Sequence, residues 1–175
     1  MNDAVHRLTI AMMERSLRNI GDVMDKARAH AEAEEIGLDV LLQSRLFPDM
    51  FNLLQQLQYV CYIPVDFARH FSSAPSPHVG YDESTWEQLR ESIDTTANYL
   101  ASIRPADVAA KAEAVVPIFF DDSRGLAAQD YAATVIVPDF YFHMTVAYAI
   151  LRHNGVKLGK RDFLGNISAA TSITG

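Results

Sequence analysis

Two ionisable side chains stand alone in an apolar stretch near the carboxyl end of the chain. From Tyr131 to Leu151 the only side chains that can carry a charge near neutral pH are Asp139 and His143, which are four positions apart. On an α-helix this spacing places both on one face. Because a lone buried carboxylate or imidazole is costly, we expect the pair to bind a metal, take part in chemistry, or be satisfied by hydrogen bonds.

The pair could supply two ligands to a divalent metal ion. Zinc, nickel, manganese and iron all accept the carboxylate oxygen of Asp139 and the imidazole nitrogen of His143. A third protein donor is needed, and spacing dictates none of the candidates, which are Asp49, Gln56, Asp66 and His70. The alternative is a metal-free ion pair or hydrogen bond that also satisfies the Thr134 carbonyl, which Pro138 leaves without its helical partner.

A small-molecule pocket is a further expectation for the same region. The tyrosines that could line it with Asp139 and His143 are Tyr59, Tyr62, Tyr131, Tyr141 and Tyr148. A general base and hydrogen-bond donors would then converge on one ligand. The alternative for aromatic residues at helical spacing is simple packing in the core.

Three other side chains favour structural roles. Asp66 and His70 repeat the four-residue spacing, but Arg69 and a serine-rich continuation predict a solvated helix end. Cys61 lies on an apolar face without a basic neighbour in sequence, which predicts an unreactive core thiol. The regions of Asp66 and Asp139 echo each other, because in each a proline precedes an Asp-Phe pair and a histidine follows.

Four stretches with helical periodicity must position these residues. The predicted helices cover residues 3–31, 48–71, 84–104 and 128–153. Ser84 and Glu87 form the predicted capping box of the third helix. Pro64 and Pro138 predict kinks in the second and fourth helices.

These elements predict an all-α fold, a four-helix bundle of residues 1–165 with a tail at 166–175. The links after the second and third helices are longer than the loops that join antiparallel neighbours, so we expect a crossover connection. Residues 72–81 carry two prolines, which favours an extended path. Residues 115–120 predict a short strand that turns at residues 121–125 and forms a small hairpin before the last helix.

Composition narrows the class of protein. The chain of 175 residues has 49% hydrophobic side chains and a net charge of -7, which argue for one globular domain and against nucleic-acid binding. A single cysteine and the lack of a signal-peptide pattern predict a cytoplasmic protein. Residues 131–151 are long enough to cross a bilayer, but Pro138, Asp139 and His143 at their middle favour a protein without membrane contact.

The carboxyl-terminal third carries a long signature: Pro138-Asp139-Phe140-Tyr141-Phe142-His143, then residues 147–155 and 159–165. It resembles the closing signature of an uncharacterised bacterial family of small helical proteins, placed beside the DinB/YfiT-like four-helix bundles. Residues 46–51 and the spacing of the first helix are similar too, so the resemblance covers about residues 3–165.

The resemblance implies a bundle with one crossover and frequent homodimers. In many DinB/YfiT-like members it also implies a divalent metal, held by one histidine of the second helix and a His-x-x-x-His pair of the fourth. Some of those members are hydrolases or thiol transferases. Here His143 matches the second histidine of the pair, whereas Asp139 stands at the first position and His70 lies late on the second helix. These departures argue against inherited metal chemistry.

Two functions are therefore expected. The first is a homodimeric bundle protein with a small-molecule pocket around Asp139 and His143 and a degenerate or absent metal site. The alternative is a metal-dependent enzyme that uses the same pair with a donor from the second helix. The homodimer is expected because the fourth helix is apolar around its circumference, whereas each helix of a four-helix bundle keeps one face toward solvent. Alternatively, the chain is a monomer in which the connector at residues 105–125 covers this face, and Phe119 and Phe120 then seal the pocket.

Overall fold

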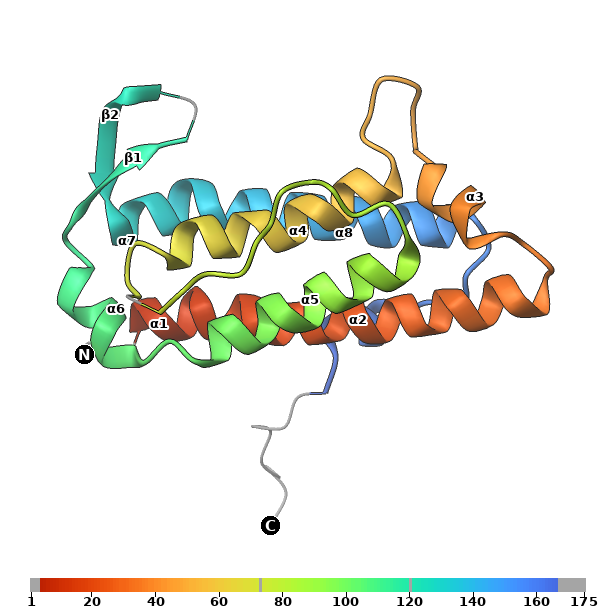
Figure 1. The fold of residues 1–175 in the computed structure, drawn as a ribbon, viewed down its shortest axis with the longest axis horizontal. Coiled ribbons are helices and arrows are strands. Elements are labelled where there is room, and N and C mark those ends of the chain that lie inside the picture. Colours follow the sequence, from red (N-terminus) through yellow and green to blue (C-terminus); the bar gives the residue numbers. More distant parts are fainter. Residues whose placement is uncertain (1–3, 73, 120, 167–175) are drawn as a thin grey trace, which may run out of the picture.

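The computed structural model describes residues 4–72, 74–119 and 121–166. In this part of the chain four long helices lie side by side around one hydrophobic core (Figure 1): α2 (Ile10–Ala33), α4 (Leu53–Ala68), α5 (Trp86–Ala101) and α8 (Val137–His153). The shorter helices are α1 (Ala4–Leu8), α3 (Leu38–Gln43), α6 (Pro105–Lys111), α7 (Ala128–Tyr131) and α9 (Lys160–Leu164). The expectation of a helix-dominated protein is confirmed, with a small two-stranded sheet added.

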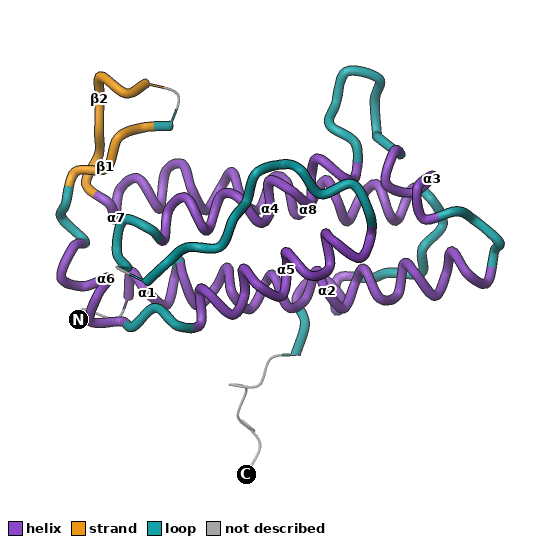
Figure 2. Tube along the Cα trace, viewed as in Figure 1, coloured by secondary structure: helices purple, strands orange, loops and turns teal. Residues whose placement is uncertain are grey.

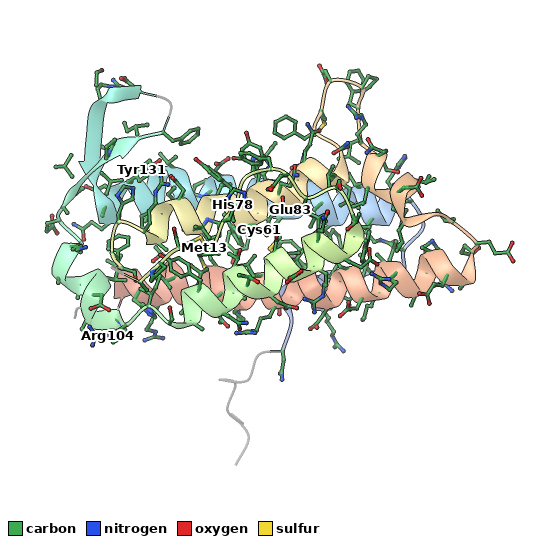
Figure 3. All side chains as sticks on the ribbon, viewed as in Figure 1. Met13, Cys61, His78, Glu83, Arg104 and Tyr131 are labelled. Atoms are coloured by element: carbon green, nitrogen blue, oxygen red, sulfur yellow. The ribbon has the colours of Figure 1, made fainter. Side chains whose placement is uncertain are left out.

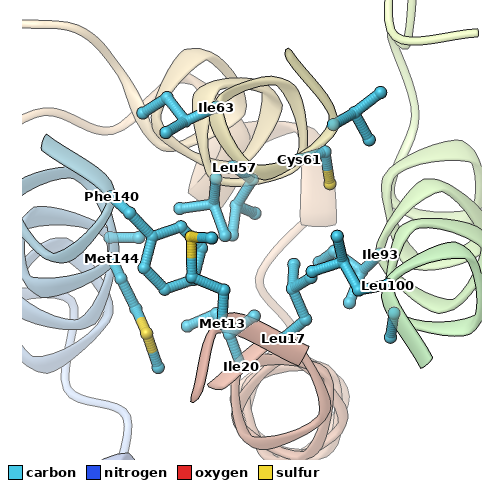
Figure 4. Close-up of a cluster of buried hydrophobic side chains, with 14 of the residues drawn as sticks. Met13, Leu17, Ile20, Leu57, Cys61, Ile63, Ile93, Leu100, Phe140 and Met144 are labelled. Carbon is cyan, nitrogen blue, oxygen red and sulfur yellow. The ribbon is translucent and has the colours of Figure 1, made fainter. Parts of the chain in front are cut away.

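The core joins all four long helices through interdigitating apolar side chains (Figure 4). On α2 the fully buried positions recur at alternating spacings of four and three, as the sequence predicts for a bundle seam; they are Met13, Leu17, Ile20, Met24 and Ala27. Leu57 of α4 and Phe140 of α8 meet this seam from the other side. Burial of these side chains stabilises the bundle by roughly 1.5–3 kcal/mol for each large one.

A long connection between α4 and α5 sets the direction of the helices. Residues 69–85 return along the length of the bundle, so α4 and α5 point the same way while α2 and α8 point the other way (Figure 1). Figure 2 shows this segment as one extended loop across the bundle. The loop is the kind of crossover that the connection lengths predict, and it lies over the side of α4 where the candidate site is found.

The helices begin at different residues from those predicted. The α4 helix starts at Leu53, not at Pro48, because the Asn52 side chain accepts a hydrogen bond from the Gln55 N–H and the Gln55 side chain accepts one from the Asn52 N–H. The first predicted helix is divided at Thr9, whose hydroxyl donates to the Val5 carbonyl.

The capping box of α5 is also shifted by one residue from the prediction. Thr85 and Gln88 form it, not Ser84 and Glu87. Glu87 instead pairs with Arg28 of α2. A serine and a threonine stand side by side at this helix start, and Trp86 and Leu89 of the first turn are buried in the core.

The last long helix contains a π-helical turn before its proline. The turn, η1 (Ala132–Ile136), joins α7 to α8, and Pro138 is the second residue of α8. Because proline lacks the N–H of a regular helical bond, a wider turn is one way to accommodate it. The sequence predicts that Pro138 leaves the Thr134 carbonyl without a helical partner. The hydroxyl of the same residue donates a hydrogen bond to the Asp130 carbonyl. The structure places Pro64 inside α4 without interrupting that helix.

The predicted hairpin is present, but its turn comes earlier than expected. The strand β1 (Val115–Ile118) pairs antiparallel with β2 (Asp121–Ala127), so residues 121–125 belong to a strand and not to the turn. Gly125 lies opposite Pro117, and a Cβ at Gly125 would come within 2.9 Å of the Val116 carbonyl oxygen. The glycine therefore permits a close approach between strands. The predicted strand end, Phe120, lies outside the described residues.

Within the described residues, one helical stretch is long and apolar enough to cross a membrane, Ala128–His153. Buried core helices of soluble proteins have the same composition, and α8 packs against α4 and α2. Of the predicted tail, residues 167–175 lie outside the described residues.

Candidate functional site

The site is built where α8 packs against α4. Asp139 and His143 lie on successive turns of α8, with His143 Nε2 3.5 Å from Asp139 Oδ1. The imidazole is buried, whereas the carboxylate keeps about 30% of its side chain exposed. The predicted pair therefore shares one helix face, with its histidine inside and its carboxylate at an edge.

Gln56 of α4 fixes the orientation of the imidazole. Its Oε1 lies 2.7 Å from His143 Nδ1, and its Nε2 donates to the Phe51 carbonyl at 3.4 Å. Since the amide nitrogen is directed to Phe51, the oxygen faces the ring and His143 Nδ1–H is the donor. The remaining nitrogen, Nε2, is directed to Asp139. Gln56, one of the four predicted third donors, thus reaches His143 through its ring hydrogen bond.

Aromatic rings enclose the imidazole. Tyr59 stacks on it with a centroid distance of 4.7 Å and an interplanar angle of 24°, and Phe51 lies at 6.2 Å and 19°. Phe142 meets the ring edge-on at 5.2 Å. These contacts hold the histidine in one plane and limit the access of water to it.

A cavity of about 150 Å³ opens beside Asp139. Its walls come from α4, from the η1 and α8 turn, from α7, from the crossover loop and from the end of β1; they are Tyr59, Tyr62, Ile63, Asp66, Tyr81, Phe119, Tyr131, Ile136 and Asp139. Two larger hollows, of about 460 and 590 Å³, are lined largely by charged and polar side chains, and a third, of about 410 Å³, is lined mostly by apolar ones. The small cavity combines an apolar wall with convergent polar groups.

Tyr81 closes the cavity from the crossover loop. Its φ of 59° lies in the left-handed region, which bulky residues rarely adopt. Its ring lies 5.1 Å from the rings of both Tyr59 and Tyr62, which are themselves 6.3 Å apart. An unusual backbone conformation at a ligand-sized cavity is typical of functional sites.

The cavity contains two carboxylates, and their charge reaches the tyrosines. Burial raises the pKa of Tyr62, and the charge of Asp66 raises it further. Burial likewise raises the pKa of Tyr131, to which Asp66 and Asp139 both add, although a hydrogen bond from the Phe119 N–H opposes the shift. Tyr62 and Tyr131 therefore stay neutral at physiological pH.

Asp66 corrects one of the sequence interpretations. The prediction of a solvated helix end is wrong for this residue, which is only 9% exposed, lines the cavity and pairs with Arg69. His70 lies in the turn after α4, where its carbonyl accepts from Lys111 and burial lowers its pKa. The two aspartates of the repeated Asp-Phe pattern, which follow Pro64 and Pro138, thus line one cavity. The repeat is visible in the sequence, but helical periodicity alone does not predict that the two residues meet.

Other predicted site residues lie elsewhere. Tyr141 hydrogen-bonds to Ser16 at 2.9 Å and Tyr148 packs on Phe163, so neither is among the residues that line the cavity. Asp49 lies in an exposed turn before α4. Cys61 is buried, and desolvation, with the charge of Glu83, raises its pKa to about 12. Figure 3 shows Tyr131 at the hairpin end of the bundle and Cys61 nearer its middle.

Tyr81 belongs to the site but is absent from the sequence expectation, whereas the sequence predicts Phe119 there only as part of a connector that seals the pocket. Both lie outside the long helices, where no hydrophobic period indicates which side chain turns inward. Within the described residues, no group of three or more His, Cys, Asp or Glu side chains could hold a metal ion.

The fold is a helical bundle with a crossover loop, and its last long helix carries an Asp–His pair. The family model described as "Domain of unknown function (DUF1993)" matches residues 5–164, and the chain belongs to this family. The structure is similar to the crystal structure of a DinB family member from Shewanella denitrificans, with 35% sequence identity and a TM-score of 0.90 over 98% of this chain and 97% of that chain. No curated protein matches. The resemblance to an uncharacterised DinB-like family is thereby confirmed.

Proposed function

We propose that this protein binds a small molecule in the tyrosine-lined cavity beside Asp139. The observation that carries the proposal is the cavity itself, in which buried Asp66 and partly exposed Asp139 face phenol rings and apolar side chains. A volume of about 150 Å³ suits a ligand of few heavy atoms, since a cavity of about that size holds a benzene-sized molecule. His143 is not among the lining residues but stacks on Tyr59 and lies 3.5 Å from the Asp139 carboxylate, so it supports both.

A metal-dependent enzyme is the second candidate, and one contact favours it. With Nδ1 bonded to Gln56, the other ring nitrogen of His143 is directed to Asp139, and both groups are chemically suited to zinc, nickel, manganese or iron. Such an ion would supply a Lewis acid or an activated water. The donor set fits only in part, because two protein donors fall short of the three that a catalytic site commonly has.

The first prediction separates these functions with one matched pair of variants. His143→Ala should abolish binding of fragment-sized ligands detected by NMR, because the Tyr59 wall and the Asp139 carboxylate lose their support. His78→Ala is the control, since His78 and Asp82 form the same i, i+4 pair on the exposed surface. Protein purified without an affinity tag should carry no stoichiometric metal by elemental analysis.

The outcomes discriminate clearly. Bound metal in wild type that disappears in His143→Ala but not in His78→Ala supports the enzyme instead of the simple pocket. Ligand binding unchanged in both variants, or absent from the cavity residues of the wild type, contradicts the pocket.

We also infer a homodimer in solution. An apolar groove of about 410 Å³ lies where α1 crosses the start of the α7–η1–α8 helix, lined by Leu8, Met12, Ala133 and Val137 among others. Leu8 is 66% exposed there. A contiguous apolar surface of this kind on a small domain supports self-association, because two copies can cover each other around a two-fold axis.

A further inference from the structure

The walls of the cavity are electron-rich and negatively charged. Four tyrosines, Tyr59, Tyr62, Tyr81 and Tyr131, share it with two aspartates, and the described lining residues include no lysine, arginine or histidine. Phenol faces and phenol oxygens both attract positive charge, as carboxylates do. The lining is therefore unsuited to an anion and favourable for a cation.

The two carboxylates are only partly neutralised by protein groups. Asp66 pairs with Arg69, whose side chain is 57% exposed and does not line the cavity. Asp139 contacts His143 at 3.5 Å, beyond the range of a strong hydrogen bond. Both charges reach the Tyr131 phenol in the same lining, because burial raises the pKa of Tyr131 and both carboxylates add to that shift.

The kind of cation follows from the rest of the wall. Ile63, Ile136 and Phe119 line the cavity together with the tyrosine rings, and these groups cannot replace the water shell of a compact metal ion. An alkylated ammonium carries its charge on an apolar surface and loses little hydration on entry. It fits both the apolar side chains and the aromatic faces.

We propose that the ligand of this cavity is a small organic cation of the alkylammonium class, held by aromatic faces and by the Asp139 carboxylate. The proposal rests on the proposed function, because it specifies the chemistry of the molecule that the same cavity binds. Tyr59, Tyr62 and Tyr81, with rings 5.1–6.3 Å apart, form the aromatic part of the site, and Asp66 and Asp139 supply the negative field.

Three probes of similar size and different charge test the proposal on the full-length protein. Tetramethylammonium, tert-butanol and pivalate are titrated separately, and binding is followed by NMR shifts of the tyrosine and isoleucine side chains. We expect tetramethylammonium to bind at least about tenfold more tightly than tert-butanol, and pivalate not to bind, because one charge contact in a partly buried site is worth over 1.4 kcal/mol.

Variants assign the preference to its groups. Asp139→Asn should weaken tetramethylammonium binding about tenfold, whereas the exposed control Asp82→Asn should leave it unchanged. Tyr62→Leu should weaken it by roughly threefold to thirtyfold and Tyr62→Phe by much less, since phenylalanine keeps the aromatic face. Circular dichroism verifies that each variant is folded.

The results distinguish failure of this inference from failure of the proposed function. If tert-butanol or pivalate shifts the cavity resonances as strongly as tetramethylammonium, the cation preference is wrong and the small-molecule pocket stands. If no probe shifts them, both proposals are wrong. Because the comparison of probes uses wild-type protein, it does not depend on any variant folding.

Discussion

His143 is a buried residue whose two ring nitrogens face groups of different kinds. Gln56 accepts from Nδ1, and Nε2 is directed to the Asp139 carboxylate. Gln56 is itself 1% exposed, so its amide depends on His143 and on the Phe51 carbonyl for hydrogen bonds. Gln56 and His143 therefore rely on each other for a hydrogen bond inside the protein.

The prediction at this scale concerns Gln56→Leu. The change leaves the buried His143 N–H without an acceptor, so we expect the free energy of unfolding to fall by about 1–3 kcal/mol, measured by urea denaturation. Glu32→Leu, at an exposed position on α2, should change it by less than about 0.5 kcal/mol. Equal effects of the two substitutions would contradict the hydrogen bond to His143.

Capping hydrogen bonds fix the residues at which α4 and α5 begin. At α5 the Thr85 hydroxyl accepts from the Gln88 N–H at 3.2 Å, while the Gln88 side chain accepts from the Thr85 N–H. This register buries Trp86 and Leu89. Ser84, one residue earlier, bonds only to the Gln88 side chain.

The cap predicts unequal costs for two neighbouring substitutions. Thr85→Ala should lower the free energy of unfolding by about 1 kcal/mol, because a helix N–H loses its acceptor. Ser84→Ala should cost less, since its hydroxyl satisfies no backbone group of the helix. Chemical denaturation of both variants tests the register, and a larger loss for Ser84→Ala would show that the cap begins one residue earlier.

The whole molecule leaves an apolar groove uncovered between α1 and the α7–η1–α8 helix. The connector at 105–125 does not cover the exposed face of α8 completely, since Phe142 remains 56% exposed. Of the other aromatic residues on α8, Phe140 is fully buried and Tyr148 is half-buried. The hairpin instead contributes Phe119 to the cavity wall.

The prediction for the whole molecule concerns its mass in solution. Light scattering at micromolar concentration should give about twice the monomer mass of 19.5 kDa. Ala133→Glu places a charge in the groove and should produce a monomer, whereas Val40→Glu, at an apolar residue 56% exposed on α3, should not. A monomeric wild type would contradict the dimer and leave the groove without a second copy to cover it.

The sequence by itself determined the helical class and the position of the main helices. Apolar residues at spacings of four and three on α2 fix the buried face, because every stable packing must cover that stripe. It also indicated the pair on α8, because two ionisable groups in an apolar helix require a satisfied environment. Helix starts were less certain, since Ser84 and Thr85 have equivalent capping chemistry and packing chooses between them.

Only the tertiary structure decided which side chains share the cavity. Asp66 and Asp139 are over seventy positions apart, and the packing of α4 on α8 brings them to one wall. Tyr81 and Phe119 arrive from a crossover loop and a hairpin, where no period relates sequence position to direction. Tyr141, two positions after Asp139 on α8, lies on another face of the helix and bonds to Ser16 of α2. The physical reason is that a helix has several faces, and its neighbours determine which face encloses a site.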